Sequence, residues 1–123
     1  MQINQLIVKS NSGLKMNIKK IPEDRDGSVL RLMKNHGADF SKKRSVDFFF
    51  YFKDETSANL AKAALQELDL EVEITDNGKN NEWLCLATTK LNLGYNTLIK
   101  YRKKFEQIAE KFNGEYDGWE TML

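Results

Sequence analysis

Three carboxylates stand close together near the C-terminal end of the sequence, at Glu115, Asp117 and Glu120. Carboxylate oxygens at this spacing could hold a hard cation, and two of them could act as a general acid and a general base. Asp117 precedes Gly118, however, and an Asp-Gly pair is typical of a turn or bulge. Acids that flank a turn are usually solvated or bonded to backbone amides. We therefore interpret these three as surface or anchoring residues.

The single histidine and the single cysteine do not suggest a catalytic or metal site. His36 is expected at the end of a helix, on its apolar side, in a structural or C-capping role, because no Cys or acidic pair stands near it at metal-ligand spacing. Cys85 lies beside Leu84 and Leu86, which predicts a buried strand thiol. No phosphate-binding glycine loop is present in the sequence. We expect no enzyme, no cofactor and no metal.

Two aromatic residues, Phe49 and Tyr51, point to a different chemistry, the stacking of RNA bases on an open sheet face. They alternate with an apolar series in the same segment, so they are predicted on the opposite face of a strand. Glu71 and Glu73 are expected on that same face, where they would repel phosphates. A covered or protein-binding face is the leading interpretation, and a small RNA-binding module that also uses a basic helix is the alternative. The lysines of that helix are Lys100, Lys103, Lys104 and Lys111.

The charge is unevenly distributed although the net charge is only +1. Residues 1–47 hold ten Lys/Arg against five Asp/Glu, a balance of +5, whereas residues 48–123 hold nine against thirteen, a balance of −4. Residues 54–82 alone hold eight acids and two lysines. The small net charge offers no general attraction to nucleic acid or acidic lipids. The split could instead orient a protein partner.

Length and composition predict a single globular domain. The chain has 123 residues, of which 41% are hydrophobic, enough to bury a core without disulfides. No apolar run reaches the roughly 20 residues that span a bilayer, and the N-terminus does not have the pattern of a signal peptide. One cysteine excludes an intramolecular disulfide. We expect a cytoplasmic protein in a reducing compartment.

The first half of the chain is predicted to position these residues on a helix and a strand. Residues 1–21 alternate loosely around a polar tip at 10–13 and predict a hairpin-like extension. A helix is expected over about 26–36, ended by Gly37. The strongest strand follows, from Arg44 to Lys53.

The second half predicts the rest of a compact α+β domain. Asp54 is expected to cap a helix over about 55–68, followed by a strand and a return strand. A last helix is expected over about 95–113, with Gly114 as the left-handed residue that ends it. The tail should then dock as a further strand. This order predicts a ferredoxin-like antiparallel sheet (βαββαβ) with the helices on one face, preceded by an extra N-terminal helix.

A longer pattern runs from about Asp26 to Thr121. It includes an Asp-led helix start at 26–30, its ending at 36–39, the segment 44–47 that leads into the strong strand, and the closing string Glu-Tyr-Asp-Gly-Trp at 115–119. This pattern resembles the family of the regulator of ribonuclease E activity B (RraB), and the closing string is its most specific part. Two features depart from the family. Phe48 stands where members often have a histidine, and the acid-rich extension of enterobacterial members is absent.

The resemblance implies an α+β domain over residues 22–123 and a non-enzymatic bacterial regulator of RNA degradation. Such a protein would bind ribonuclease E, or another component of its complex, by protein–protein contact and reduce cleavage. We expect the acidic stretch 54–76 to meet a basic segment of the partner, because complementary charge orients and accelerates association. Two aromatic residues of the tail would either dock it or serve as an apolar anchor. The patterning is also compatible with a homodimer. The predicted partner-binding residues are Glu67, Asp69, Glu71, Glu73, Tyr116, Asp117, Trp119 and Glu120.

Overall fold

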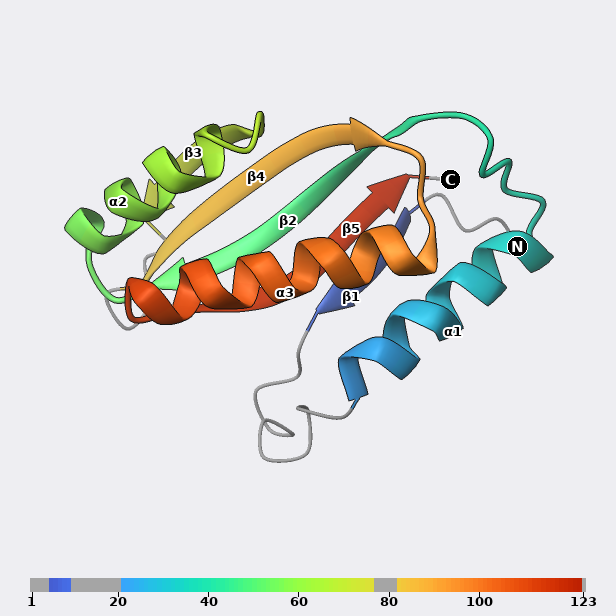
Figure 1. The fold of residues 1–123 in the computed structure, drawn as a ribbon, viewed down its shortest axis with the longest axis horizontal. Helices are drawn as coiled ribbons and strands as arrows, with labels where there is room; N and C mark the ends of the chain where they lie inside the picture. The colour runs from blue at the N-terminus through green and yellow to red at the C-terminus, as the bar shows by residue number, and fades with distance from the viewer. Residues whose placement is uncertain (1–4, 10–20, 77–81, 123) are drawn as a thin grey trace.

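The computed structural model describes residues 5–9, 21–76 and 82–122, with side chains from residue 26 onward. Helices and strands alternate through most of the chain (Figure 1). In chain order they are β1 (Gln5–Lys9), α1 (Ile21–Asn35), β2 (Arg44–Phe52), α2 (Glu55–Gln66), β3 (Glu71–Asp76), β4 (Trp83–Leu91), α3 (Tyr95–Lys111) and β5 (Gly114–Met122).

The five strands form one antiparallel sheet in the order β1-β5-β2-β4-β3. β2 lies at its centre and pairs with β4 on one side and with β5 on the other. The C-terminal tail is therefore strand β5, inserted between β1 and β2. The predicted α+β class and the predicted docking of the tail are both confirmed.

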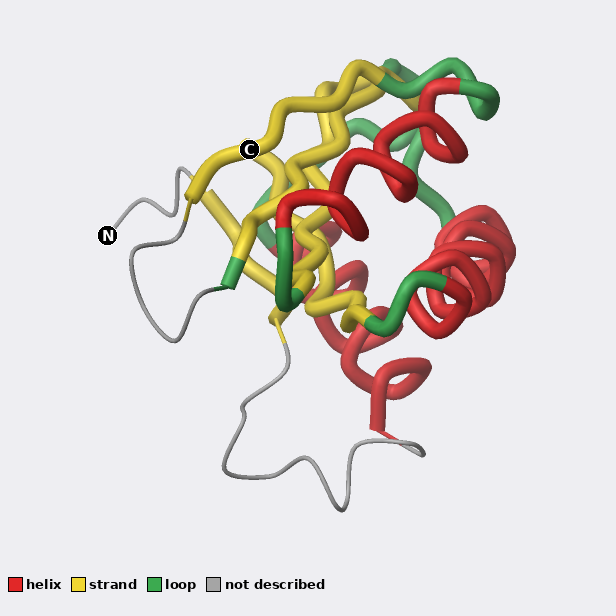
Figure 2. The backbone as a smooth tube through the Cα atoms, turned by 90° about the vertical axis from the view of Figure 1, so that its left-hand side faces the viewer, coloured by secondary structure: helices red, strands yellow, loops and turns green. Residues whose placement is uncertain are grey.

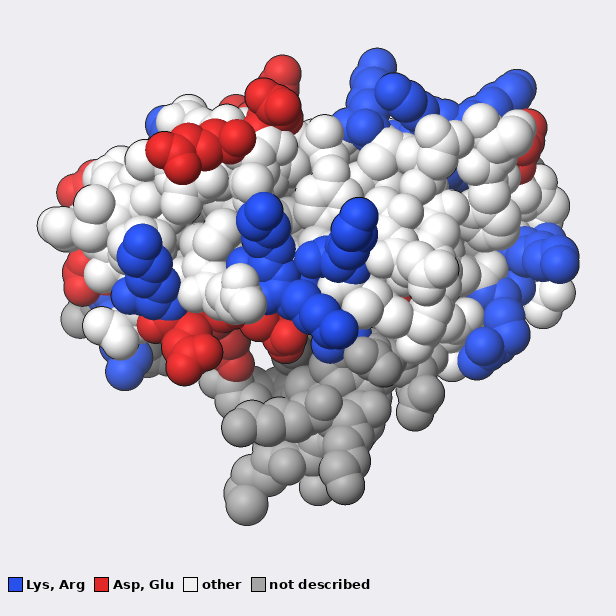
Figure 3. Space-filling model, viewed as in Figure 1, with Lys and Arg blue, Asp and Glu red and all other residues white. Residues whose placement is uncertain are grey.

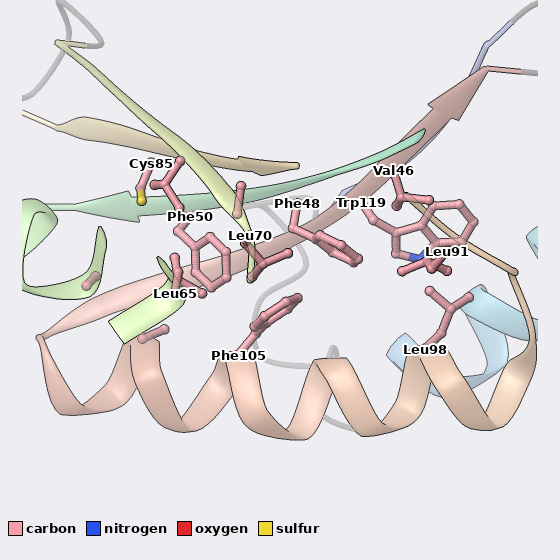
Figure 4. Close-up of a cluster of buried hydrophobic side chains, with 14 of the residues drawn as sticks. Val46, Phe48, Phe50, Leu65, Leu70, Cys85, Leu91, Leu98, Phe105 and Trp119 are labelled. Carbon is pink, nitrogen blue, oxygen red and sulfur yellow. The ribbon is translucent and has the colours of Figure 1, made fainter. Parts of the chain in front are cut away.

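α2 and α3 pack on one face of the sheet, and in Figure 2 the helices lie mostly to one side of the strands. α1 contacts α3 and β1. The core lies between the layers, where phenylalanine side chains of β2 meet Leu98 and Phe105 of α3 and Leu65 of α2 (Figure 4). The ring of Phe105 lies edge-on to two of these phenylalanines, with centroid distances of 4.8 and 5.1 Å. The buried residues of β2 on this side are Val46, Phe48, Phe50 and Phe52.

Two helix ends have the predicted caps. The side chain of Asp54 accepts a hydrogen bond of 2.7 Å from the backbone N–H of Ser57, which satisfies a free amide at the start of α2. Gly37, after α1, has a φ of +83°, and the N–H of Ala38 reaches the carbonyl of Met33. A left-handed residue with this six-residue hydrogen bond is a Schellman cap, which glycine adopts at little cost.

The end of α3 differs from the prediction. The left-handed residue is Asn113, with a φ of +57°, and Gly114 is already the first residue of β5. Glycine is required at 114 for space. A Cβ atom there would collide with the ring of Phe52 and lie 2.7 Å from the carbonyl oxygen of Tyr51. The sequence predicted a cap from the glycine, whereas the structure uses that glycine for a close approach between β5 and β2.

The N-terminal part of the chain also corrects the sequence prediction. α1 begins at Ile21 rather than near 26, with Pro22 in its first turn, where a proline lacks no required hydrogen bond. His36 ends this helix as predicted, but its side chain is exposed and not on the apolar side. One arm of the predicted hairpin is β1, which pairs with β5. The other arm falls at 10–20, outside the described residues.

Candidate functional site

A buried polar cluster joins α1, α3 and β5. The indole Nε1–H of Trp119 donates a hydrogen bond of 2.9 Å to Oδ1 of Asp26, and Nε of Arg102 lies 3.7 Å from Oδ2 of the same carboxylate. Asp26 is 3% exposed and Trp119 is 1% exposed. Groups this deeply buried need partners of this kind, because an isolated charge in the core would be very costly. The cluster therefore fixes the position of the tail.

The sequence contains a signal for this cluster that the hydrophobic periodicity of α3 does not by itself reveal. Arg102 stands at a core-facing position of α3, between Leu98 and Phe105 at helical spacing. A lone arginine within an apolar stripe needs a buried acid, and Asp26 at the start of the recognised pattern is that acid. Residues 102 and 26 are 76 positions apart, so no local pattern links them.

Tyr116 belongs to the same region. Its ring lies 5.1 Å from that of Phe50 and 5.4 Å from that of Phe105, centroid to centroid. Burial, and then the nearby carboxylate of Asp26, raise the pKa of the Tyr116 phenol well above its usual range. The side chain is thus a neutral part of the packing. Together with Trp119 it docks the tail, the first of the two roles considered from the sequence.

The opposite face of the sheet has a different composition. The strand register places three rows of residues across it, from β3 through β4 and β2 to β5. The outer positions of β4 and β2 are apolar or aromatic along two of these rows, whereas the positions at the edges are mostly acidic. The rows are Glu71-Thr88-Asp47-Glu120, Glu73-Leu86-Phe49-Gly118 and Thr75-Leu84-Tyr51-Glu115.

A bulge in β5 adds further negative charge to this face. The register between β2 and β5 shifts between Phe49 and Phe50, which leaves Asp117 as an extra residue, followed by Gly118 with a φ of +111°. The predicted bulge at this pair is confirmed. Burial raises the pKa of the Tyr51 phenol, and the carboxylates of Asp117 and Glu82 raise it further. Tyr51 therefore lies in a field of negative charge.

The predicted partner-binding residues divide among three places. Glu71 and Glu73 are exposed on β3, on the outer face. Glu120 and Asp117 are half-buried on β5, which is separated from β3 by β4 and β2. Trp119 lies in the core and offers no surface to a partner. The remaining three are Tyr116 in the docked tail, and Glu67 and Asp69, exposed in the turn between α2 and β3. The structure thus brings the β3 and β5 acids onto one face and places Tyr116 and Trp119 on the other, helix-covered side.

The helical face carries the opposite charge. Basic side chains follow α3 along the surface that faces the viewer in Figure 3. Between them on the helix stand Glu106 and Glu110, which reduce the net charge. The Oε1 atom of Glu106 lies 3.8 Å from Nη1 of Arg102. The exposed lysines of this helix are Lys100, Lys103, Lys104 and Lys111.

Other candidate chemistry finds little support within the described part of the chain. No group of three or more His, Cys, Asp or Glu residues there could hold a metal ion. Cys85 is fully buried on β4, and burial raises the pKa of its thiol to about 12. A thiol with that pKa is un-ionised at neutral pH and a poor nucleophile. None of the helices in these ranges has the length and apolar character needed to cross a membrane.

The fold defines a small α+β protein with lysines along its helical face and acids bordering its outer sheet face. A family model described as regulator of ribonuclease activity B matches residues 23–121. That match spans most of the sequence, and the chain therefore belongs to the RraB family. It starts within α1 and ends in β5, so it includes Asp26, Arg102 and Trp119. The comparison with curated proteins found no match.

Proposed function

We propose that this protein is a non-enzymatic regulator that binds ribonuclease E, or another protein of its complex, and reduces its activity. Membership of a family of regulators of ribonuclease activity carries this proposal. The partner is taken from the family resemblance. Action by protein contact is supported by the acidic outer face, because such a face would repel RNA and attract a basic protein segment.

The proposed contact surface includes the acids of the turn and strand after α2. Glu67, Asp69, Glu71 and Glu73 are all exposed and lie within seven residues of one another. Glu120 and Asp117 extend the same negative charge on β5. Trp119 is left out of this surface because it is buried. Tyr116 contributes through the position of β5 rather than as an anchor.

The experiment that tests this function is an affinity purification of the tagged protein from its own cell lysate, with and without ribonuclease treatment. Recovery of ribonuclease E or its associated proteins under both treatments is expected. The purified protein should then slow cleavage of a model transcript by ribonuclease E. Recovery of an unrelated protein alone, together with unchanged cleavage, would contradict the proposal.

The alternative function, a small RNA-binding module, is favoured by the row of lysines on α3. The other part of that hypothesis, the stacking of bases on Phe49 and Tyr51, has weaker support. Phe49 is only 8% exposed, and the face that carries Tyr51 is bordered by carboxylates. Loss of the recovered proteins on ribonuclease treatment, with affinity that falls steeply as salt rises, would move the assignment to this alternative.

Two finer parts of the assignment are also proposals. The strand order β5-β2-β4-β3, with α2 and α3 on one face, supports a ferredoxin-like arrangement for residues 44–122. The buried free thiol of Cys85 supports a cytoplasmic location, where thiols stay reduced.

A further inference from the structure

Strands β2 and β4 are apolar on both faces along much of their length. On the helix side they supply the phenylalanine core, and on the outer side they present Leu84, Leu86, Phe49 and Tyr51. A sheet with one wet face normally alternates apolar and polar residues. Strands buried on both faces have the composition seen here. No helix of the described residues covers the outer face, and Leu84, Leu86 and Tyr51 remain half-buried on it.

Acidic residues border this apolar strip on two sides. Glu71 and Glu73 lie on β3. Glu120 and Glu115 lie on β5, three strand spacings away, in the rows of Asp47 and Tyr51 respectively. At about 4.8 Å between neighbouring strands, the two borders are about 14 Å apart. An α-helix with its side chains is about 10 to 12 Å across. The width of the strip therefore matches a single helix, with a carboxylate border along each of its sides.

We propose that the outer sheet face binds an amphipathic helix of a partner protein. The apolar side of that helix lies along Leu84, Leu86 and Tyr51, and its lysines and arginines, on both flanks, pair with the glutamates of β3 and β5. The bound helix would form a third layer that covers the sheet opposite α2 and α3. The identity of the partner rests on the proposed function, whereas the chemistry of the surface does not.

Charge selects this occupant over a second copy of the chain. Two copies joined through this face would bring the carboxylates of both borders together, and such like-charge contacts are costly. Among the residues whose side chains the structure describes, the basic ones near the face are Lys90, which lies on it, and Lys53, which follows the end of β2. The register also places Lys9 of β1 beside Gly118, outside the β5 border. Asp47, in the strip's first row, already accepts a hydrogen bond of 2.8 Å from Thr88. The border glutamates thus supply most of the charge that a basic helix would meet.

The test uses the full-length protein and a synthetic peptide of about 15 residues, about 22 Å long as a helix. The peptide carries leucines on one side, lysines on both flanks and a fluorophore, and its binding is followed by anisotropy. A peptide with the same residues in scrambled order is the control. We expect the amphipathic peptide to bind at least about tenfold more tightly, and amide NMR shifts to change on β2, β3 and β4 rather than on α3.

Protein variants locate the contact. Glu71→Lys with Glu73→Lys should weaken peptide binding about tenfold, because two favourable charges become repulsive. The matched control, Glu55→Lys with Glu110→Lys, makes the same change of charge on exposed positions of α2 and α3 and should alter affinity less than about twofold. Leu86→Thr keeps a strand-forming residue and should weaken binding about threefold by removing apolar contact. Circular dichroism checks that each variant is folded.

The outcomes separate this proposal from the proposed function. Equal effects of the two charge variants, or NMR shifts confined to α3, would overturn the docking surface even if ribonuclease E is recovered from lysate. Sedimentation that shows a dimer dissociated by Leu86→Thr would overturn it in favour of a second copy. Peptide binding at this face, without recovery of a ribonuclease complex, would support the surface and remove the assigned partner.

Discussion

At the scale of single residues, Trp119 has a role that its size alone does not reveal. Its indole packs in the core, and the indole N–H donates a hydrogen bond to the carboxylate of Asp26. Asp26 belongs to α1 and lies 93 positions earlier in the chain. That carboxylate also lies near Arg102 of α3. A single buried acid thus links α1, α3 and β5. Trp119 of the tail therefore has a structural role, because its indole N–H is hydrogen-bonded to Asp26 inside the protein.

Replacement of Trp119 by phenylalanine should therefore destabilise the protein. We expect the free energy of unfolding to fall by about 2 kcal/mol or more, because a hydrogen bond to a buried charge is lost and a smaller ring leaves space. Urea denaturation followed by circular dichroism measures this. Trp83→Phe is the control, since Trp83 is half-buried and no hydrogen bond of its indole is seen among the described residues. Equal losses for both variants would argue against the role of Asp26.

The raised pKa of the Cys85 thiol predicts how the free energy of unfolding changes at alkaline pH. Burial raises its thiol pKa from 9.0 to about 12. The unfolded thiol ionises first as pH rises, so the folded state is favoured fully below about pH 9 and progressively loses this advantage towards about pH 12. The free energy of unfolding should fall across that window. The fall should be shallower in Cys85→Ala, and parallel curves for the two proteins would show that the thiol does not contribute.

At the scale of elements, β5 shows how closely the tail is fitted to its neighbours. It pairs with β2 and β1, contains one bulge at Asp117 and Gly118, and starts at a glycine whose hydrogen faces the ring of Phe52. A strand at a chain terminus usually frays. Here pairing on both sides and the buried Trp119 oppose fraying.

Gly114→Ala should disturb this fit. The added methyl group would meet Phe52 and the carbonyl oxygen of Tyr51, and overpacking of this kind costs about 1 to 3 kcal/mol. Gly27→Ala is the matched control, because its Cβ would have only ordinary side-chain contacts at 3.4 Å and would favour helix α1. Thermal unfolding compares the two. A melting temperature of Gly114→Ala at or above that of the parent would contradict the steric account.

The elements were largely predictable, and the exceptions have physical reasons. Alternation in β2, the cap at Asp54 and the Asp-Gly bulge are local signals, and each is seen in the structure. The cap assigned to Gly114 failed because the sequence does not show which ring will pack against a glycine. The buried cluster was missed because its members are distant in the chain. The division of the predicted site acids between β3 and β5 follows from strand order, which periodicity does not specify.

At the scale of the whole molecule, charge is sorted by layer. The exposed lysines of α3 lie on the helical face, whereas the outer sheet face is bordered by Glu71 and Glu73 on one side and Glu120 on the other. The net charge of +1 conceals this division. A partner with a basic segment would be attracted to one face and repelled from the other, so the sorted charge favours one orientation of approach.

This sorting predicts the salt dependence of partner binding. If ribonuclease E is the partner, its association rate with the full-length protein should fall several-fold between about 50 and 300 mM salt, since the Debye length shortens from about 14 to about 6 Å. In Glu71→Lys with Glu73→Lys the rate should be lower at low salt and nearly independent of salt, because the attractive border is gone. Glu55→Lys with Glu110→Lys carries the same net charge and should keep the parent's slope, which stopped-flow fluorescence measures. The same change of slope in both variants would mean that net charge, rather than the sheet face, controls the encounter. Equal slopes in all three proteins would mean that neither net charge nor this face controls it, and the lysines of α3 would then be the next surface to vary.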